Sequence, residues 1–344
     1  MQCRRPAPTR AAMLVMLVAC GPTPSLSFAA DPADTPATDD DFALQGEYVG
    51  EATVNGEKMK IGIQVIAQGK GKFAAVAYPG GLPGAGWMPP NKLKGSGVRA
   101  GTGADARVTL EGVDWGGVAR KGEVRKGEVV ALADDGSVTA RFSRVERTSP
   151  TLGQKPPAGA VVICDGSGPV DETKTFDKGA RFTADGLLME GATVTQPFGD
   201  ATWHIEFRTP YQSDRSGQGR GNSGVYVNGG YEVQVLDSFG LEGRDNECGG
   251  IYGNGPPAVN MCLPPLTWQT YDIDFTAPRF TDGRKVANAR ITVRHNGVVI
   301  HDDRELRGMT AGHQAKQEEP TGKLHLQNHN EPVRFRNIWV LPKP

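Results

Sequence analysis

The chain has 344 residues, and 38 Lys and Arg against 39 Asp and Glu give it a formal net charge of −1. Acidic and basic residues are interspersed, so no basic block indicates a nucleic-acid partner. The 46 Gly and 25 Pro, with few stretches of helical apolar repeat, favour an all-β protein of two domains.

The N-terminus predicts export. A basic start precedes the apolar run 11–19, which is too short for a membrane span of ~20 residues. Leu17-Val18-Ala19-Cys20 is similar to a bacterial lipobox and would put a lipid on Cys20, whereas Ser27-Phe28-Ala29 suits an ordinary signal peptidase. We favour the lipobox and assign residues 1–30 to a signal or lipoprotein signal and the start of a linker. The protein is then periplasmic or membrane-anchored, touching the membrane only through the lipid anchor.

Residues 31–41, rich in Asp, Pro, Ala and Thr, read as a linker before a small all-β domain over 42–148. Ile61, Ile63 and Val65 alternate with Lys60, Gly62 and Gln64, as in a half-buried antiparallel strand. The domain is expected to be a β-barrel or β-sandwich, and it holds no recognisable catalytic group. Its predicted strands are 46–54, 59–67, 72–78, 106–110, 115–124, 129–132 and 137–145.

A proline-containing connector, 149–160, leads to the second domain, 161–344. Asn296-Gly297 between alternating apolar residues is a strong hairpin signal. Many antiparallel strands in under two hundred residues fit a jelly-roll sandwich. The predicted strands are 187–190, 201–209, 223–227, 231–236, 268–275, 289–295, 298–302, 322–328 and 333–340.

Three of these strands each offer a polar face with a titratable group. By alternation, Glu206 lies with His204 and Arg208, Glu232 with Gln234, and His325 with Gln327 and then His329. If the strands are neighbours on one sheet, they line one cleft, with Asn222 at its rim. The alternative for each strand is a solvated outer face.

Four segments carry a resemblance: Asn222 to Asp237, Cys248 to Gly253, Pro256 to Phe275 and Gly322 to Pro342. In this order they resemble the 3-keto-disaccharide hydrolase family, over about residues 161–341. The resemblance implies a concanavalin-like jelly roll that acts on glycosides already oxidised to a ketone at carbon 3.

The implied reaction is cleavage of the glycosidic bond, by hydrolysis or by elimination across C1–C2 followed by hydration. The partners are then an oxidised carbohydrate and an upstream glycoside 3-dehydrogenase. The alternative is a non-catalytic, lectin-like carbohydrate-binding protein. We assign catalysis to Glu232, His329 and Glu206, and substrate binding to Asn222, Gln234, Gln327, His325 and Arg208.

A divalent metal ion, calcium or manganese, is a possible cofactor. Asp272 and Asp274 flank Ile273 on one strand face and are read either as solvated or as calcium ligands. No Cys or His spacing indicates zinc.

Export permits disulfides, and Cys248 and Cys262 close a loop of ~15 residues rich in Gly and Pro, so we predict that they are bonded. The alternative is two unrelated buried thiols. Cys164 ends an apolar run and is expected to be a core thiol.

Overall fold

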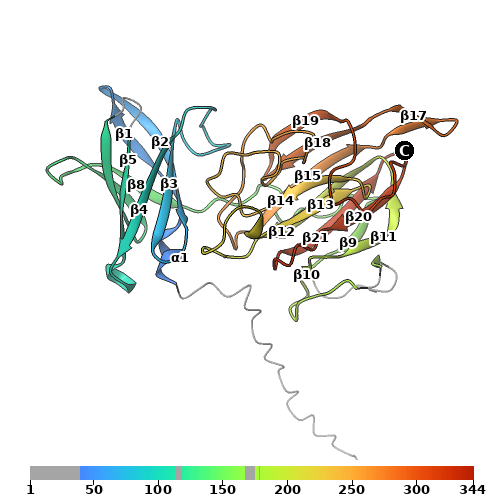
Figure 1. Ribbon diagram of the computed structural model, residues 1–344, viewed down its shortest axis with the longest axis horizontal. Helices are drawn as coiled ribbons and strands as arrows, with labels where there is room; N and C mark the ends of the chain where they lie inside the picture. The colour runs from blue at the N-terminus through green and yellow to red at the C-terminus, as the bar shows by residue number, and fades with distance from the viewer. Residues whose placement is uncertain (1–38, 114–117, 167–174, 178) are drawn as a thin grey trace, which may run out of the picture.

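The computed structural model describes residues 39–113, 118–166, 175–177 and 179–344. Two β units stand side by side in Figure 1, an N-terminal barrel and a C-terminal sandwich. The predicted signal, Cys20 and most of the predicted linker lie outside the described residues. In the part of the chain that is described, no helix is long and apolar enough to cross a membrane.

The first unit is a closed barrel of eight antiparallel strands in chain order, with β1 pairing β8. This resolves the choice between barrel and sandwich. The short helix α1 (Asp40–Leu44) packs at one end, where Asp41 accepts from the N–H of Gly71 and from Arg99. The strands are β1 (Gly46–Val54), β2 (Glu57–Ala67), β3 (Lys72–Pro79), β4 (Leu93–Ala100), β5 (Arg107–Val113), β6 (Ala119–Arg125), β7 (Glu128–Leu132) and β8 (Val138–Val145).

The second unit is a two-sheet sandwich, as the jelly-roll prediction requires. The larger sheet runs β10-β21-β12-β15-β18-β19 with β9 on β21, the smaller runs β11-β20-β13-β14, and β16 pairs β17. The strands are β9 (Val161–Cys164), β10 (Leu188–Met189), β11 (Thr193–Phe198), β12 (Ala201–Arg208), β13 (Ser223–Val227), β14 (Tyr231–Val235), β15 (Gln269–Thr276), β16 (Arg279–Thr281), β17 (Arg284–Ala287), β18 (Ala289–His295), β19 (Val298–Leu306), β20 (Gly322–Leu326) and β21 (Arg334–Pro342).

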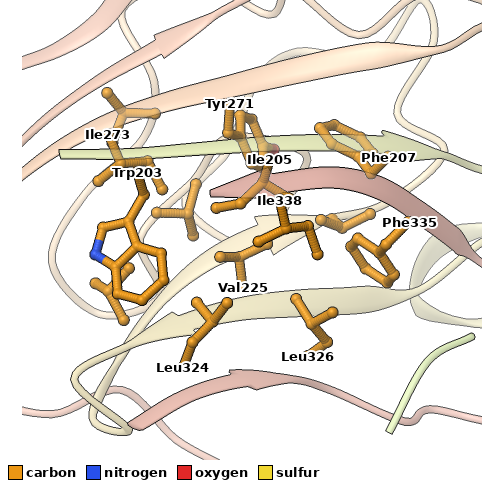
Figure 2. Close-up of a cluster of buried hydrophobic side chains, with 14 of the residues drawn as sticks. Trp203, Ile205, Phe207, Val225, Tyr271, Ile273, Leu324, Leu326, Phe335 and Ile338 are labelled. Carbon is orange, nitrogen blue, oxygen red and sulfur yellow. The ribbon is translucent and has the colours of Figure 1, made fainter. Parts of the chain in front are cut away.

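Apolar side chains fill the space between the two sheets (Figure 2). Trp203, Ile205 and Phe207 point inward from β12, and Val225 and Leu326 face them from β13 and β20. Since successive side chains of a strand point to opposite faces, the residues between them point outward. On β12 these include Glu206, and on β14 the outward residues are Glu232 and Gln234.

The predicted hairpin at Asn296-Gly297 is confirmed: it joins β18 to β19, and both residues have positive φ, 50° and 78°. Strand β4 was not predicted. Its inward positions include Gly95 and Gly97, which give no apolar alternation to read. Strands β9, β11, β16 and β17 were also missed; β11 carries Pro197 and a register shift.

The predicted disulfide is wrong: Cys248 and Cys262 are free, buried thiols. The two thiols lie within hydrogen-bond reach of one another, and each also has a further partner in the core. Cys248 Sγ lies 3.2 Å from the Tyr271 hydroxyl, and Cys262 Sγ donates to the Leu236 carbonyl at 3.6 Å. Burial raises the pKa of Cys262 well above its ordinary value, and it raises the pKa of Cys164 to about 11, so neither is a reactive thiolate.

The barrel packs firmly on the sandwich. Ile66, Val76 and Tyr78 of the barrel belong to the same buried apolar cluster as the sandwich core. A buried ion pair seals this contact: Arg220 Nε donates to Asp237 at 2.6 Å, while its Nη1 donates to the Ala67 carbonyl of β2 at 3.1 Å. Arg220 therefore connects the two units.

Replacing Arg220 by Met should lower the free energy of unfolding by about 3–5 kcal/mol, because it leaves Asp237 as a buried, unpaired charge. Urea titration measures the loss. The control is Arg290→Met, which breaks the exposed pair with Asp303 and should cost far less. Equal losses of unfolding free energy from the two substitutions would show that the buried pair stabilises the protein no more than the exposed pair does.

Candidate functional site

The outer face of the smaller sheet carries a row of polar side chains that runs across four strands. Glu232 on β14 is directly opposite Tyr226 on β13, which is opposite His325 on β20, which is opposite Thr193 on β11. Neighbouring strands lie ~4.8 Å apart, so Glu232 and His325 flank Tyr226 at ~10 Å from one another, measured between backbones. His325 Nδ1 is 2.8 Å from Thr193 Oγ1.

A second row lies beside the first. Gln234 pairs with Gly224, whose carbonyl accepts from the N–H of Gln327 at 2.9 Å. Gly224 leaves room for the carboxyl of Glu232, because a Cβ at this position would overlap Glu232 Oε1. Gln327 Nε2 in turn reaches the Tyr226 hydroxyl at 3.4 Å. The two rows therefore place one carboxyl, one phenol, one imidazole and two amides on a single face.

The carboxyl of Glu232 is buried, with 5% of the side chain exposed. Burial raises the pKa of Glu232 to about 7, and a hydrogen bond with Tyr226 offsets only part of this shift. The Tyr226 hydroxyl is a weak stabiliser of the carboxylate because its single hydrogen is donated to the Ala311 carbonyl at 2.7 Å. Near neutral pH, Glu232 is thus divided between its acid and base forms.

Burial also governs the histidine of this row. It holds the pKa of His325 below the ordinary value of 6.5, so the imidazole is neutral at pH 7. The face therefore combines a carboxyl that titrates near neutrality with an uncharged imidazole, two groups that can exchange protons with a bound ligand.

Buried amides continue the face beyond Gln234. Asn222 Nδ2 and Gln234 Nε2 both donate to Gln218, at 2.8 Å to its carbonyl and 3.2 Å to its Oε1, respectively. This leaves Asn222 Oδ1 and Gln234 Oε1 buried without a hydrogen-bond partner. A buried acceptor without a partner is costly, and a ligand hydroxyl would satisfy it. Gln218 is exposed and can be displaced by such a ligand.

Two predicted site residues lie elsewhere. The prediction that Glu206 and Arg208 line one cleft with Glu232 is wrong, because β12 belongs to the larger sheet and β14 to the smaller. Arg208 stacks over the Trp268 ring at 4.9 Å. The alternation placed both residues on an outer face correctly, but it did not reveal which sheet each strand joins.

Glu206 is an anchor for the connector between the two units. Its carboxylate accepts from the N–H of Gly153 at 2.5 Å, from Arg336 at 2.8 Å and from Asn337 at 2.8 Å. Burial opposes ionisation, but these bonds and one from His204 lower the pKa of Glu206 to about 2. It therefore stays ionised and cannot serve as an acid.

His204 completes this anchor. Burial works against its charge, but hydrogen bonds to Asp272 at 2.6 Å and to Glu206 raise its pKa, so the imidazole is held between two carboxylates. Thr151 of the connector donates to Asp272 at 2.7 Å. Asp272 therefore belongs to this anchor, with 17% of its side chain exposed.

His329 is exposed, in the loop that follows β20. Its catalytic role stays a prediction. In the described ranges 39–113, 118–166, 175–177 and 179–344, no group of three or more His, Cys, Asp or Glu is placed to hold a metal ion. A divalent metal cofactor, calcium or manganese, stays a prediction.

The sequence interpretation missed Tyr226, Thr310 and Gln218. Tyr226 could have been predicted, since it shares a strand face with Gly224 on the strand that precedes Glu232. Thr310, whose Oγ1 accepts from the N–H of Glu232 at 3.0 Å, and Gln218 lie in irregular segments, where no periodicity indicates the direction of a side chain.

The raised pKa of Glu232 predicts a specific loss of stability at high pH. The unfolded chain releases this proton near the ordinary value of 4.5, whereas the folded protein holds it until about 7. The contribution of Glu232 to the free energy of unfolding is fully present below pH 4.5. It is lost as the pH rises to 7, and the loss is up to about 3 kcal/mol. Glu232→Gln removes it, so the stability of the wild type relative to this variant should fall between pH 4 and pH 8.

Urea titrations of both proteins at several pH values measure this difference, in which the titration of all other groups cancels. Glu206→Gln is the matched control: because the pKa of Glu206 is lowered to about 2, its difference from the wild type should change in the opposite sense below about pH 4.5 and stay nearly constant from pH 5 to pH 8. A difference for Glu232→Gln that stays constant with pH would contradict a raised pKa.

Comparisons with known proteins find similar chains for the sandwich. Residues 159–341 match the family model of the 3-keto-alpha-glucoside-1,2-lyase-like domain. No curated protein is a significant match. A crystal structure at 2.13 Å of a candidate glycosyl hydrolase from Parabacteroides distasonis ATCC 8503 is similar, with 31% identity over 54% of this chain and 85% of that chain, at a TM-score of 0.48. Another from the same organism, at 1.70 Å, has 17% identity over 54% and 95%, at a TM-score of 0.39. The chain belongs to the family of 3-keto-alpha-glucoside-1,2-lyase-like domains.

Proposed function

We propose that the sandwich cleaves the glycosidic bond of 3-keto-glycosides, by elimination across C1–C2 followed by hydration. The observation that carries this proposal is the buried carboxyl of Glu232, whose pKa of about 7 suits proton transfer at neutral pH. Membership of a glycoside-acting family supports the substrate class.

The ketone at carbon 3 makes the hydrogen on carbon 2 acidic. A base takes this proton. The electron pair of the C2–H bond then forms a C2=C3 double bond, and the negative charge moves to the oxygen on carbon 3, which gives an enolate. Expulsion of the aglycone breaks the C1–O bond and forms the C1=C2 double bond, while an acid protonates the leaving oxygen. Water then adds its oxygen to C1 and a proton to C2, so the sum is hydrolysis without any oxidant.

We assign the removal of the proton on C2 to the carboxylate of Glu232. About half of this carboxyl is ionised at pH 7, so it can take a proton and return it during hydration. Ordinary glycosidases use two carboxylates placed on either side of the bond. Here the second predicted carboxylate, Glu206, is on the other sheet, which favours a path that begins at C2.

Donors for the enolate oxygen come from the amide and phenol groups of the same face. Gln327 and Tyr226 lie between Glu232 and His325 in the two rows. The unpartnered oxygens of Asn222 and Gln234 would accept hydrogen bonds from sugar hydroxyls once Gln218 moves aside. Oriented donors of this kind stabilise charge that develops in the transition state.

Once Glu232 has taken the proton from C2, the same carboxyl can deliver it to the leaving oxygen, because a pKa of about 7 suits both its acid and its base form. The neutral imidazole of His325, which the strand register places across Tyr226 from Glu232, is assigned a hydrogen bond to the sugar. An enzyme that oxidises glycosides at carbon 3, such as a glycoside 3-dehydrogenase, must supply the substrate.

Turnover should require the ketone. A 3-keto-glucoside should release its aglycone, whereas the unoxidised parent should not, since only the ketone acidifies C2. Glu232→Gln should lower the rate ~10²–10⁴-fold. Glu206→Gln is the control and, at a temperature where it is folded, should keep its rate within a few-fold. Binding without turnover of either sugar would support the lectin-like alternative and contradict the proposal.

Gly224→Ala tests whether the place of the carboxyl matters apart from its charge. The added Cβ should displace Glu232 and lower turnover strongly, while Gly308→Ala, which adds its Cβ in open space, should have no effect. Circular dichroism and thermal unfolding would show that both variants are folded. Full activity of a folded Gly224→Ala protein would remove the present position of Glu232 from the mechanism.

We also propose that the protein is exported and anchored by a lipid on Cys20. The motif Leu17-Val18-Ala19-Cys20 after an apolar run supports this. Cys20→Ser should move the protein from the membrane fraction to the soluble periplasmic fraction. A soluble distribution of both versions would favour cleavage near Ala29.

A further inference from the structure

The N-terminal barrel encloses a cavity of about 790 Å³, far from Glu232. At its mouth lie the β1–β2 and β7–β8 hairpins and the end of β5, represented among the lining residues by Asn55, Asp134 and Val113. In a barrel of consecutive antiparallel strands these hairpins share one end, while α1 packs against the turns of β2–β3 and β4–β5 at the other. The cavity therefore opens at the end opposite α1.

Residue size explains the cavity. Near α1 the interior is filled by Tyr48, Val65, Phe73, Val108 and Val124, which are at most 1% exposed. Toward the mouth, the inward positions hold small residues instead. Six of these are Ala52, Ala77, Gly95, Gly112, Gly122 and Ala131.

The strand register brings these small residues together. Gly95 pairs with Gly112 on β4 and β5, and Gly122, Ala131 and Ala140 pair in turn on β6, β7 and β8. Larger side chains lie between the two groups, because Arg120 is opposite Gly112 and Leu110 is opposite Gly122. An eight-stranded barrel is just wide enough for side chains to fill it or for one small ligand to occupy it. In this barrel the side chains do not fill the half nearer the mouth.

The wall selects an apolar ligand. Its backbone N–H and C=O groups are used in the strand ladders, which close all the way round from β1 to β8, so they offer little to a polar molecule. Among the described residues that line the cavity, Phe142 is the one aromatic side chain. Val113 and Val118 at the mouth are 53% and 51% exposed, which extends the apolar wall to the entrance.

We infer that the barrel binds a small molecule with a long apolar body, of the fatty-acyl type. The volume lies in the ~300–1,000 Å³ range of small-molecule sites. Arg120 is among the lining residues and shares the inward face of β6 with Gly122 and Val124, so a charged side chain near the mouth can hold the polar end of such a ligand. This site is separate from the sugar site, and its existence does not depend on the proposed catalysis.

Titration of the full chain with cis-parinaric acid, an intrinsically fluorescent fatty acid, tests the inference. The wild type should bind it saturably at one molecule per chain. Ala131→Phe fills the cavity from an inward position and should weaken binding about tenfold or more. Thr109→Phe adds the same bulk at an outward, exposed position of β5 and should bind as the wild type does.

Ala77→Leu is a second filling variant, for use if Ala131→Phe does not fold. Both filling variants should keep their turnover of the 3-keto-glycoside, which separates this site from the sandwich. No saturable binding by the wild type, or unchanged binding by a folded filling variant, would overturn the inference.

Discussion

The burial of one carboxyl on the outer face of a small β-sheet decides what this protein can do. Glu232 is opposite Tyr226, and Gly224 beside it leaves the space that the carboxyl occupies. Because burial disfavours its charge, the pKa rises to about 7. Glu206 is as deeply buried but has Arg336, Asn337 and His204 as partners, and its pKa falls to about 2. The same residue type thus yields a proton-transfer group on one sheet and a permanent anion on the other.

The anion on the larger sheet has a structural task. Glu206, His204 and Asp272 bind the connector through Gly153 and Thr151, which fixes the path of the chain between the two units. The barrel is also tied to the sandwich through Arg220 and the apolar cluster around Ile66. The smaller sheet consequently keeps its polar face for a ligand, while the larger sheet uses its polar face to hold the molecule together.

The sequence was sufficient for what depends on local pattern and insufficient for what depends on sheet membership. Alternation placed Glu232, Gln234, His325 and Gln327 on outward faces, and the register confirms that they share one sheet. The same reasoning could not separate Glu206 from them, because strand order is set by long-range pairing. Strand β4 escaped notice because its inward glycines give no apolar signal, and those glycines help to form the barrel cavity. The free thiols of Cys248 and Cys262 were missed because loop composition does not reveal the partners that each sulfur finds in the core.

The central claim is that cleavage begins with removal of the proton on carbon 2 by Glu232. The most direct measurement compares aglycone release from a 3-keto-glucoside carrying deuterium at carbon 2 with release from its protonated counterpart, in a single turnover with the wild type. Breaking the C2–H bond before or during the slow step predicts clearly slower release from the deuterated substrate. Equal rates for the two substrates, together with cleavage of the unoxidised parent glucoside, would contradict the account.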